Sequence, residues 1–438
     1  MNSIRVVVAG LGAVSPLGLT ADEMWAGLCA GKCGISKIQG FDCPEFPCKF
    51  AGQVPSYNIL QLVPKSHRKA IKLMSRDIEL AVIAANEALA NSGLITKGID
   101  PDKVNIDPTR TAINLGAGLI SCDLVEIGPA VAASTTDGTF DIRKWGKLGM
   151  EQLTPLWLLK YLPNMLACHI GIIHDIQGPS NTITCAEASA HLAIGEATQI
   201  IARGDSDIAL AGGAEAKVKP LVMLRQYFLK RAVTDNSISA ELACRPFDIE
   251  AKGSVFGEGG GVLVLENLDH ARKRSAKILA EIVGIGQSTS INPVCERLEP
   301  DGKGLKIAIQ KAMAEAQIQP DNLSLIIPHG TAIPEDDLAE ANAIQTALGR
   351  AATIVPAWPT KSMLTNTGAA GGALDIIAAV RAICNGLIPA AKNCDKKRPG
   401  CNLNILKEPR QADIKYVLCC SYTHGGQTAA VILKKFEN

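Results

Sequence analysis

Two residues with reactive side chains, Cys185 and Glu187, lie in the middle of residues 178–216, where the pattern changes from strand to helix. β-Branched residues alternate over 181–185, as in a short strand, and 188–202 is rich in Ala and Ile with almost no charge, as in a buried helix. The first turn of such a helix presents unpaired backbone N–H groups and the positive end of the helix dipole, which favour a thiolate or a carboxylate. We therefore predict that the chemistry of this chain, if it has any, lies in this turn.

The hydrophobic pattern predicts the elements that hold the turn in place. An apolar run at 207–211 predicts a strand that closes at the glycine pair 212–213, and 4–9 predicts a buried strand that leaves into a glycine-rich loop. Residues 20–29 begin with a Thr-x-x-Glu capping box and predict a helix. A longer helix is expected at 76–92, where apolar residues repeat at spacings of three and four.

The stretch 178–216 resembles the active-site segment of β-ketoacyl-ACP synthases, the condensing enzymes of fatty acid and type II polyketide synthesis. The likeness continues along nearly the whole chain, through VVVAGLGAVSPLG (6–18), LPNMLACHIGI (162–172), RPFDIEAKGSVFGEGGGVLVLE (245–266), PHGTAIPEDD (328–337) and TKSMLTNTGAAGG (360–372). In that family a cysteine nucleophile occupies the turn. The resemblance implies acyl carrier protein as a partner, its phosphopantetheine arm as the ligand and no bound cofactor.

The resemblance also implies an α/β, thiolase-type fold, with two duplicated mixed-sheet halves in an αβαβα layering. Two weak echoes in the sequence agree with a duplication: 280–290 repeats the pattern of the N-terminal strand and glycines, and 416–435 repeats that of 254–265. The charged segment 269–276 is the best place for the junction. We therefore expect halves at 1–268 and 277–438.

The spacing of the family motif places Glu187, and not Cys185, at the nucleophile position. The family's cysteine lies eight residues after the Pro of a Gly-Pro pair and eight before the Gly of a Gly-Glu-Ala sequence, and Pro179 and Gly195 both count to Glu187. A displaced turn that brings Cys185 to the position is the alternative. A carboxylate would give a labile mixed anhydride instead of a stable thioester, so Glu187 is not expected to support condensation.

Other residues of the site are implied by the same motifs. His329 matches the first catalytic His, which stabilises an enolate oxygen in the family, Lys361 matches the active-site Lys, and Glu340 matches a buried acid. Thr331 retains one of two Thr residues that hold the pantetheine arm, whereas Ile333 replaces the other. Loss of that second hydroxyl weakens the expected binding of the arm without excluding it.

Three further positions depart from the family pattern. Asn366 stands at the second catalytic His; an amide can hold a thioester carbonyl with His329 but cannot act as a base. Tyr422 and His424 lie in the segment that forms a gate over the acyl pocket in the family, and His424 replaces an apolar gate residue. His424 either pairs with Glu187 or lies at the rim without a role, and the second reading is favoured.

Composition adds broad limits. A net charge of +1 over 438 residues gives no electrostatic reason to expect nucleic acid or a membrane surface as partner, although a local basic patch would suffice for an acidic carrier protein. The 14 Cys residues are scattered without zinc-type CxxC pairs, which predicts reduced, buried thiols and no metal site. We find no signal peptide and no apolar run of membrane-spanning length, and expect a cytoplasmic protein.

Three functions remain open from the sequence. The first is a non-condensing partner subunit, resembling the chain-length factors that form heterodimers with a Cys-containing ketosynthase; a homodimer is the other possible assembly. The second is a malonyl-ACP decarboxylase that uses His329 and Asn366. The third is an active β-ketoacyl-ACP synthase, an acyltransferase, that uses Cys185. Four changes around one pocket argue against the third, so whether the chain is an enzyme is left open.

Overall fold

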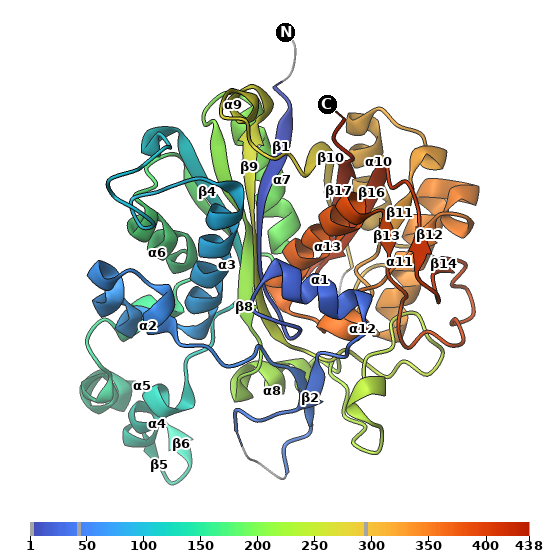
Figure 1. Cartoon of the computed structure of the whole chain (residues 1–438). Helices are drawn as coiled ribbons and strands as arrows, with labels where there is room; N and C mark the ends of the chain where they lie inside the picture. Colours follow the sequence, from blue (N-terminus) through green and yellow to red (C-terminus); the bar gives the residue numbers. More distant parts are fainter. Residues whose placement is uncertain (1–3, 42–44, 293–296, 438) are drawn as a thin grey trace.

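Strands β1 (Val6–Val14) and β10 (Ala280–Thr289) pair antiparallel at the centre of the molecule and join its two halves. The computed structural model describes residues 4–41, 45–292 and 297–437. In these residues one sheet of eleven strands runs across both halves (Figure 1). Its order is β14 (Asn404–Ile405), β12 (Pro356–Ala357), β11 (Leu325–Ile327), β16 (Tyr416–Tyr422), β17 (Gln427–Lys434), β10, β1, β9 (Glu258–Asn267), β8 (Ile208–Ala216), β4 (Thr111–Ala117) and β7 (Ser180–Ile183).

Helices cover both faces of each half and fill the space between them. Helices α7 (Ser189–Ala202) and α13 (Gly371–Asn385) contact each other and pack on strands of both halves, which makes them the middle layer. Helix α3 (Arg76–Ser92) covers β1, β8 and β9 from outside, and α10 (Lys303–Ala316) covers β10 and β17. The expected αβαβα layering is confirmed. The other helices are α1 (Ala21–Cys29), α2 (Ile59–Leu62), α4 (Leu124–Ala133), α5 (Ile142–Lys144), α6 (Met165–His174), α8 (Pro220–Phe228), α9 (Leu268–Lys273), α11 (Pro334–Leu348) and α12 (Lys361–Leu364).

Glycines at matching places in β1 and β10 explain why the sequence patterns of these two segments are similar. A Cβ on Gly12 would lie 1.9 Å from the backbone oxygen of Ala84 in α3, and a Cβ on Gly286 would lie 1.7 Å from that of Ala308 in α10. In each half, therefore, a helix touches the backbone of the first strand, which only glycine permits. The same close approach in both halves supports an internal duplication.

Two strands continue through glycines at which the sequence predicted an end. β1 runs on to Val14 through Gly10 and Gly12, and β8 continues past the pair 212–213 to Ala216. The reason is packing, since these glycines lie where another backbone approaches closely. The predicted helices 20–29 and 76–92 are confirmed as α1 and α3, and Thr20 accepts a hydrogen bond of 3.1 Å from Glu23 N as the predicted cap.

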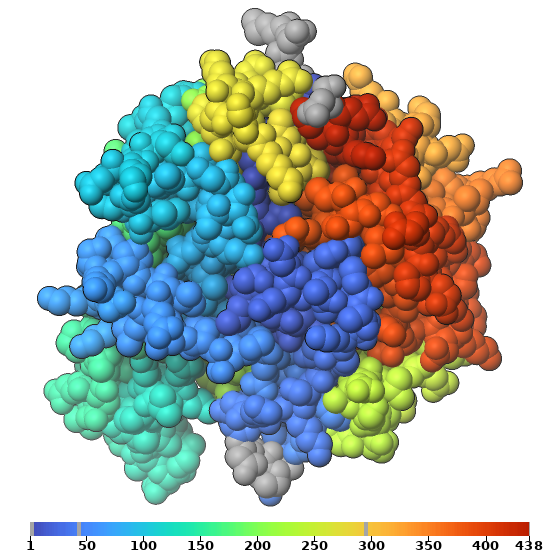
Figure 2. Space-filling model, in the orientation of Figure 1, coloured from blue at the N-terminus to red at the C-terminus, as the bar shows by residue number. Residues whose placement is uncertain are grey.

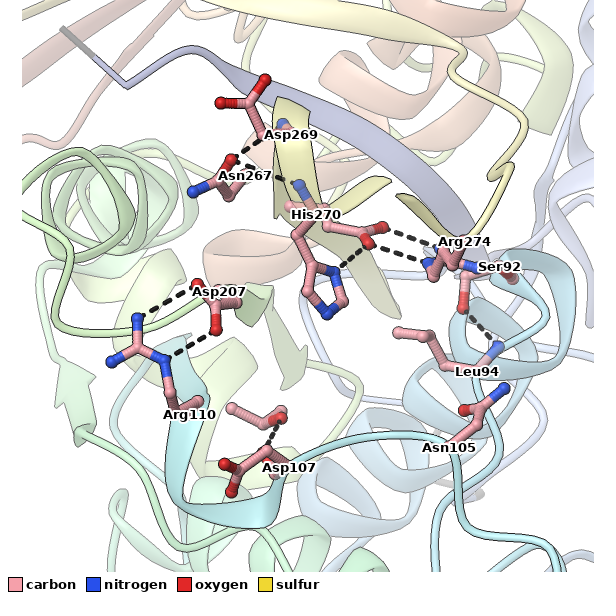
Figure 3. Close-up of polar contacts among 12 residues, drawn as sticks. Ser92, Leu94, Asn105, Asp107, Arg110, Asp207, Asn267, Asp269, His270 and Arg274 are labelled. Carbon is pink, nitrogen blue, oxygen red and sulfur yellow. Dashed lines mark hydrogen bonds and ion pairs between the residues drawn. The ribbon is translucent and has the colours of Figure 1, made fainter. Parts of the chain in front are cut away.

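Helix α9 lies in the charged segment where we propose that the halves 1–268 and 277–438 divide. Figure 3 shows this end of the sheet, where Arg110 pairs with Asp207 at 2.6 Å. Arg274 pairs with Glu266 at 2.7 Å. His270 Nδ1 lies 2.5 Å from the same glutamate. Glu266 is fully buried, so these contacts fix α9 against β9. Figure 2 shows the N-terminal segment, coloured blue, lying across the front between the two halves.

The central helix layer contains a stretch, residues 368–385, that is apolar and long enough to cross a membrane, and 83% of its apolar window is buried inside the fold. That burial is what a core helix requires, and it is the one stretch of this kind in the described residues. The described cysteines are free thiols, with the adjacent pair Cys419 and Cys420 buried in β16, while Cys43 and Cys295 lie outside the described residues.

Candidate active site

A strained turn between β7 and α7 directs Glu187 into the protein. Ala186, which precedes it, has φ of +45°, a conformation that costs a non-glycine residue free energy and persists only where packing imposes it. Glu187 is 1% exposed. Cys185 is half-buried, and its backbone N–H donates to Ser189 Oγ at 2.7 Å. The turn therefore buries Glu187, in agreement with the spacing argument.

The carboxylate of Glu187 meets a buried cation and an amide on one oxygen. Oε1 lies 3.8 Å from Lys217 Nζ and accepts a long hydrogen bond of 3.4 Å from Asn366 Nδ2. Lys217 also lies 3.2 Å from Glu215 Oε1, so Glu187, Lys217 and Glu215 form a triad of alternating charge, each member at most 2% exposed. Ser421 Oγ donates to the backbone oxygen of Glu187 at 2.8 Å and holds the turn against β16.

The pKa values of the two carboxyl groups in the triad are shifted in opposite directions. Burial alone would raise the pKa of Glu187, but the charges of Lys217 and Arg231 outweigh it and hold that pKa well below its usual range. For Glu215, burial raises the pKa above its usual range, and the attraction of Lys217 and the N–H of Ala369 offset it only in part. Glu187 is consequently the ionised partner of Lys217.

His329 is held by its backbone, and its ring is free of hydrogen bonds. Glu340 accepts from the backbone N–H groups of His329 at 2.6 Å and Gly330 at 2.8 Å, which fixes the loop after β11. The ring packs edge-on against Tyr422 with centroids 4.7 Å apart, and neither ring nitrogen has a partner in the described residues. Burial, followed by repulsion from Lys361, places the pKa of His329 far below its usual value, so the imidazole is neutral.

Lys361 serves as a fixed buried cation at the start of α12. Its Nζ lies 2.8 Å from Asp375 Oδ2, and Thr360 Oγ1 donates to the other oxygen of the same carboxylate. The ammonium faces the neutral imidazoles of His329 and His191, whose pKa values it lowers. Lys361 is therefore held in one place by Asp375, with its positive charge near both rings.

Of the two residues predicted for the pantetheine arm, Ile333 lines a polar pocket and Thr331 lies two residues before it in the chain. Thr331 is buried and donates its hydroxyl to Asp337 Oδ1 at 3.2 Å while accepting from Ile333 N at 3.2 Å, so its oxygen is already committed. Ile333 lines a pocket of about 190 Å³ in which a buried ion pair, Arg231 with Asp336 at 2.9 Å, forms part of the wall. Phe228, Lys230, Arg297 and Glu335 complete most of the rest.

The two remaining candidates, Cys185 and His424, are not joined to this network by any hydrogen bond or ion pair among the described residues. Burial raises the pKa of the Cys185 thiol, which leaves it protonated and a weak nucleophile. His424 feels the charge of Glu187, but burial lowers the pKa of His424 and its nearest polar contact is Thr423 Oγ1 at 3.5 Å. Glu187 Oε2 has no partner in the described chain, which agrees with the unpaired reading of His424.

Sequence reasoning missed the charged partners of Glu187. Lys217 and Glu215 lie two residues apart at the end of β8, and Arg231 follows α8. A signal was present, because Glu215 and Lys217 interrupt the apolar sequence IALAGGAEAKVK with the spacing of one strand face. Their partners come from distant segments, so that spacing alone names no contact. No group of three or more His, Cys, Asp or Glu side chains in the described residues is arranged to hold a metal ion.

Comparison with protein-family models gives two consecutive matches. Residues 3–271 match the model described as "Beta-ketoacyl synthase, N-terminal domain", and residues 279–395 match "Beta-ketoacyl synthase, C-terminal domain". Among curated proteins, the chain is 31% identical to "3-oxoacyl-[acyl-carrier-protein] synthase 2" of Vibrio cholerae over 99% of this chain and 100% of that protein. It is also 31% identical to the protein of the same description from Staphylococcus aureus strain MRSA252, over 100% of this chain and 99% of that one.

Solved structures of similar shape agree with these matches. "The ishigamide ketosynthase/chain length factor" superposes with a TM-score of 0.84 at 27% identity, over 99% of this chain and 100% of that chain. A type II polyketide synthase acyl carrier protein in complex with its ketosynthase bound to a hexaketide gives a TM-score of 0.85 at 25% identity, with the same coverage. A β-ketoacyl synthase from Burkholderia phymatum STM815 gives 0.85 at 27% identity, again with 99% and 100% covered.

Proposed function

Since this chain belongs to the β-ketoacyl synthase family of fatty acid and polyketide synthesis, we propose that it is a non-condensing member that assembles with a Cys-containing ketosynthase. The observation that carries the proposal is the environment of Glu187. An ionised carboxylate, buried against Lys217 and Asn366, occupies the turn at which the family pattern has its nucleophile. It cannot form a thioester, and the mixed anhydride that it would form is too labile to hold an acyl chain.

The free edge of the sheet offers a surface for the partner subunit. β7 is the last strand of the sheet, so one side of its backbone has no neighbouring strand, and Ser180 and Asn181 are exposed there. Helix α6, which contacts β7, exposes Ile172 (60%), and the excursion from residue 119 to 158 exposes Val125 (85%) and Ile142 (70%). An edge strand flanked by large apolar side chains is a surface that a second chain covers in a stable assembly. A subunit of the same fold supplies a matching edge, and a Cys-containing ketosynthase is the proposed occupant.

A basic segment supports an acyl carrier protein as the second partner. The 3₁₀ helix at Lys65–Leu73 carries Lys65, Arg68, Lys69 and Lys72, all exposed, with no acidic residue in it. None of these four side chains forms an ion pair within the described part of the chain. The net charge of +1 for the whole chain does not reveal this local basic patch, whose positive charge would attract an acidic carrier protein. The phosphopantetheine arm is the proposed ligand, and the cytoplasm the proposed location.

Malonyl decarboxylation is the weaker proposal. In its favour, His329 is neutral and both of its ring nitrogens lack hydrogen-bond partners among the described residues, so it has an N–H to offer to a thioester oxygen. Against it, Asn366, the second expected donor, already faces Glu187. The Cys185 enzyme is weaker still, because that thiol is protonated and lies outside the network.

The deciding experiment is mass spectrometry of the purified chain after incubation with acyl-ACP, beside the Cys185→Ala variant. We expect no acyl adduct on either protein. The second arm is co-expression with a Cys-containing ketosynthase from the same genome, where we expect one complex that contains both chains. A stable adduct on Cys185 that the variant lacks would identify a working condensing enzyme and overturn the proposal. Folded protein that never associates with such a ketosynthase would leave a homodimer instead.

A further inference from the structure

Lys217 lies where the family resemblance assigned nothing, and its surroundings are closed. It is 2% exposed, it lies between Glu187 and Glu215, and its ammonium lies 5.6 Å from the centre of the Phe256 ring. Gly368 packs directly on it: a Cβ there would come within 2.2 Å of Lys217 Cε and 2.0 Å of Glu215 Oε2. Such close packing holds the ammonium in one position, facing the Glu187 carboxylate.

The orientation of Asn366 is fixed by its other contacts. Its side-chain oxygen accepts from Gly368 N at 3.1 Å, so the amide nitrogen must face Glu187 Oε1. Its backbone is tied on both sides, because its N–H donates to Val255 O at 2.9 Å and its oxygen accepts from Gly257 N at 3.0 Å. The amide cannot turn away, so Glu187 takes one of its two N–H groups and places a negative charge beside the donor that an incoming thioester carbonyl would use.

The chemistry of a malonyl thioester shows what this contact prevents. In decarboxylation the bond between the α-carbon and the carboxylate carbon breaks, CO₂ leaves, and the electron pair shifts so that the thioester oxygen becomes an enolate oxygen. The α-carbon then takes a proton from water. The enolate needs hydrogen-bond donors, and a fixed carboxylate beside it repels both the enolate and the malonyl carboxylate in a low-dielectric site.

We propose that Lys217 is a positioning residue that keeps Glu187 as a carboxylate on Asn366, and that this contact keeps the chain from decarboxylating malonyl thioesters. The inference rests on the proposed function and deepens it, since it names the contact that keeps a non-condensing subunit from decarboxylating malonyl thioesters. The charged and titratable groups that face Glu187 are Lys217, Glu215, Arg231, Asp336, His329 and His424. Lys217 pairs with Glu187 at 3.8 Å.

The test measures CO₂ release from malonyl-pantetheine, which does not depend on carrier docking, by the purified full-length chain. We expect no release above background from the wild type. Glu187→Gln removes the anion, and with it the repulsion of the enolate and of the malonyl carboxylate, so we expect release to rise about 100-fold, the scale of one oxyanion interaction. Lys217→Met removes the larger of the two cationic effects on Glu187 and leaves that of Arg231, so burial should raise the pKa of Glu187 in the variant. Release should then be higher at pH 6 than at pH 8. Release by Glu187→Gln should lack that decline.

Lys219→Met is the matched control. Lys219 lies two residues further along, and its ammonium is 3.7 Å from the buried Asp77 Oδ2 and 3.3 Å from Asp123 Oδ1, so its loss also breaks a buried ion pair. We expect no CO₂ release from this variant. If Lys217→Met does not fold, the double variant Glu187→Gln/Lys217→Met, which carries one buried charge pair less, takes its place, and its release must equal that of Glu187→Gln. Adding Asn366→Ala to an active variant must return release to background.

Each outcome decides the matter. If folded Glu187→Gln does not release CO₂, the negative charge of Glu187 is not what prevents decarboxylation. If Glu187→Gln releases CO₂ but folded Lys217→Met releases none at pH 6, Lys217 is not the residue that keeps Glu187 as a carboxylate. Release by the wild type overturns the inference, while association with a Cys-containing ketosynthase, measured separately on the wild type, tests the proposed function by itself.

Discussion

Replacing Lys361 with Met tests how much the buried ion pair between Lys361 and Asp375 contributes to stability. Lys361 Nζ lies 2.8 Å from Asp375 Oδ2, and both side chains are 2% exposed. The substitution leaves Asp375 with Thr360 as its side-chain hydrogen-bond donor and with no cation. Breaking a buried pair by removing one partner costs about 3–5 kcal/mol, because the remaining charge stays buried without compensation. We expect Lys361→Met to lower the free energy of unfolding by that amount at pH 7.

The deficit should depend on pH with a definite sign. Without Lys361, burial raises the pKa of Asp375 in the folded variant above its value of about 3.9 in the unfolded chain. A group with a raised folded pKa contributes stability that is fully present below the unfolded pKa and is lost as pH rises through the folded pKa. Over the pH range of the assay the variant should therefore be closest to the wild type at the lowest pH, and its deficit should grow by at most about 1.4 kcal/mol per pH unit up to the folded pKa.

Urea denaturation followed by circular dichroism at pH 5.5, 7.0 and 8.5, at one protein concentration, gives the comparison. Lys361→Met/Asp375→Leu removes the whole pair and should recover most of the loss. Arg110→Met is the exposed control, because Arg110 and Asp207 are 41% and 29% exposed and such pairs contribute less than about 1 kcal/mol (Figure 3). A deficit below about 1 kcal/mol for Lys361→Met, or one that does not change with pH, would refute the reasoning.

Three further predictions concern the surfaces and the core. Arg68→Glu in the basic 3₁₀ helix should weaken acyl carrier protein binding and reduce its salt dependence, measured by calorimetry at 50 and 300 mM salt; unchanged binding would place the carrier elsewhere. Val125→Asp puts a charge on the exposed apolar face beside β7 and should convert the assembled protein to monomers in light scattering, and a persistent dimer would mean that another face is covered. Gly286→Ala should destabilise the chain by about 1–3 kcal/mol or more, because its Cβ would lie 1.7 Å from a backbone oxygen, whereas Gly128→Ala, where nothing lies within 4 Å, should not. Equal melting temperatures for the two glycine variants would contradict the packing of β10 on α10.

The local elements of the fold could be predicted because their signals are local. The capping box at Thr20 starts α1, and the three- and four-residue repeat of α3 follows from its own apolar positions. The ends of β1 and β8 could not be predicted, because Gly12 and Gly213 interrupt the pattern as loop residues do. They are in strands because α3 and the backbone at Ala369 come too close for a side chain. A single sequence does not distinguish a glycine that forms a turn from a glycine that lets another backbone approach the strand closely.

The candidate site divides along the same line. Counting from Pro179 and Gly195 to Glu187 needs only sequence, and the strained Ala186 and the burial of Glu187 agree with it. The protonation state of Glu187 needs the tertiary structure, because desolvation and Coulomb attraction act through space. Lys217 comes from the end of β8 and Asn366 from a loop 179 residues from Glu187 in sequence. The sequence by itself determined the family and the layered fold, and it predicted Glu187 at the nucleophile position; the folded chain decided which charges surround that carboxylate.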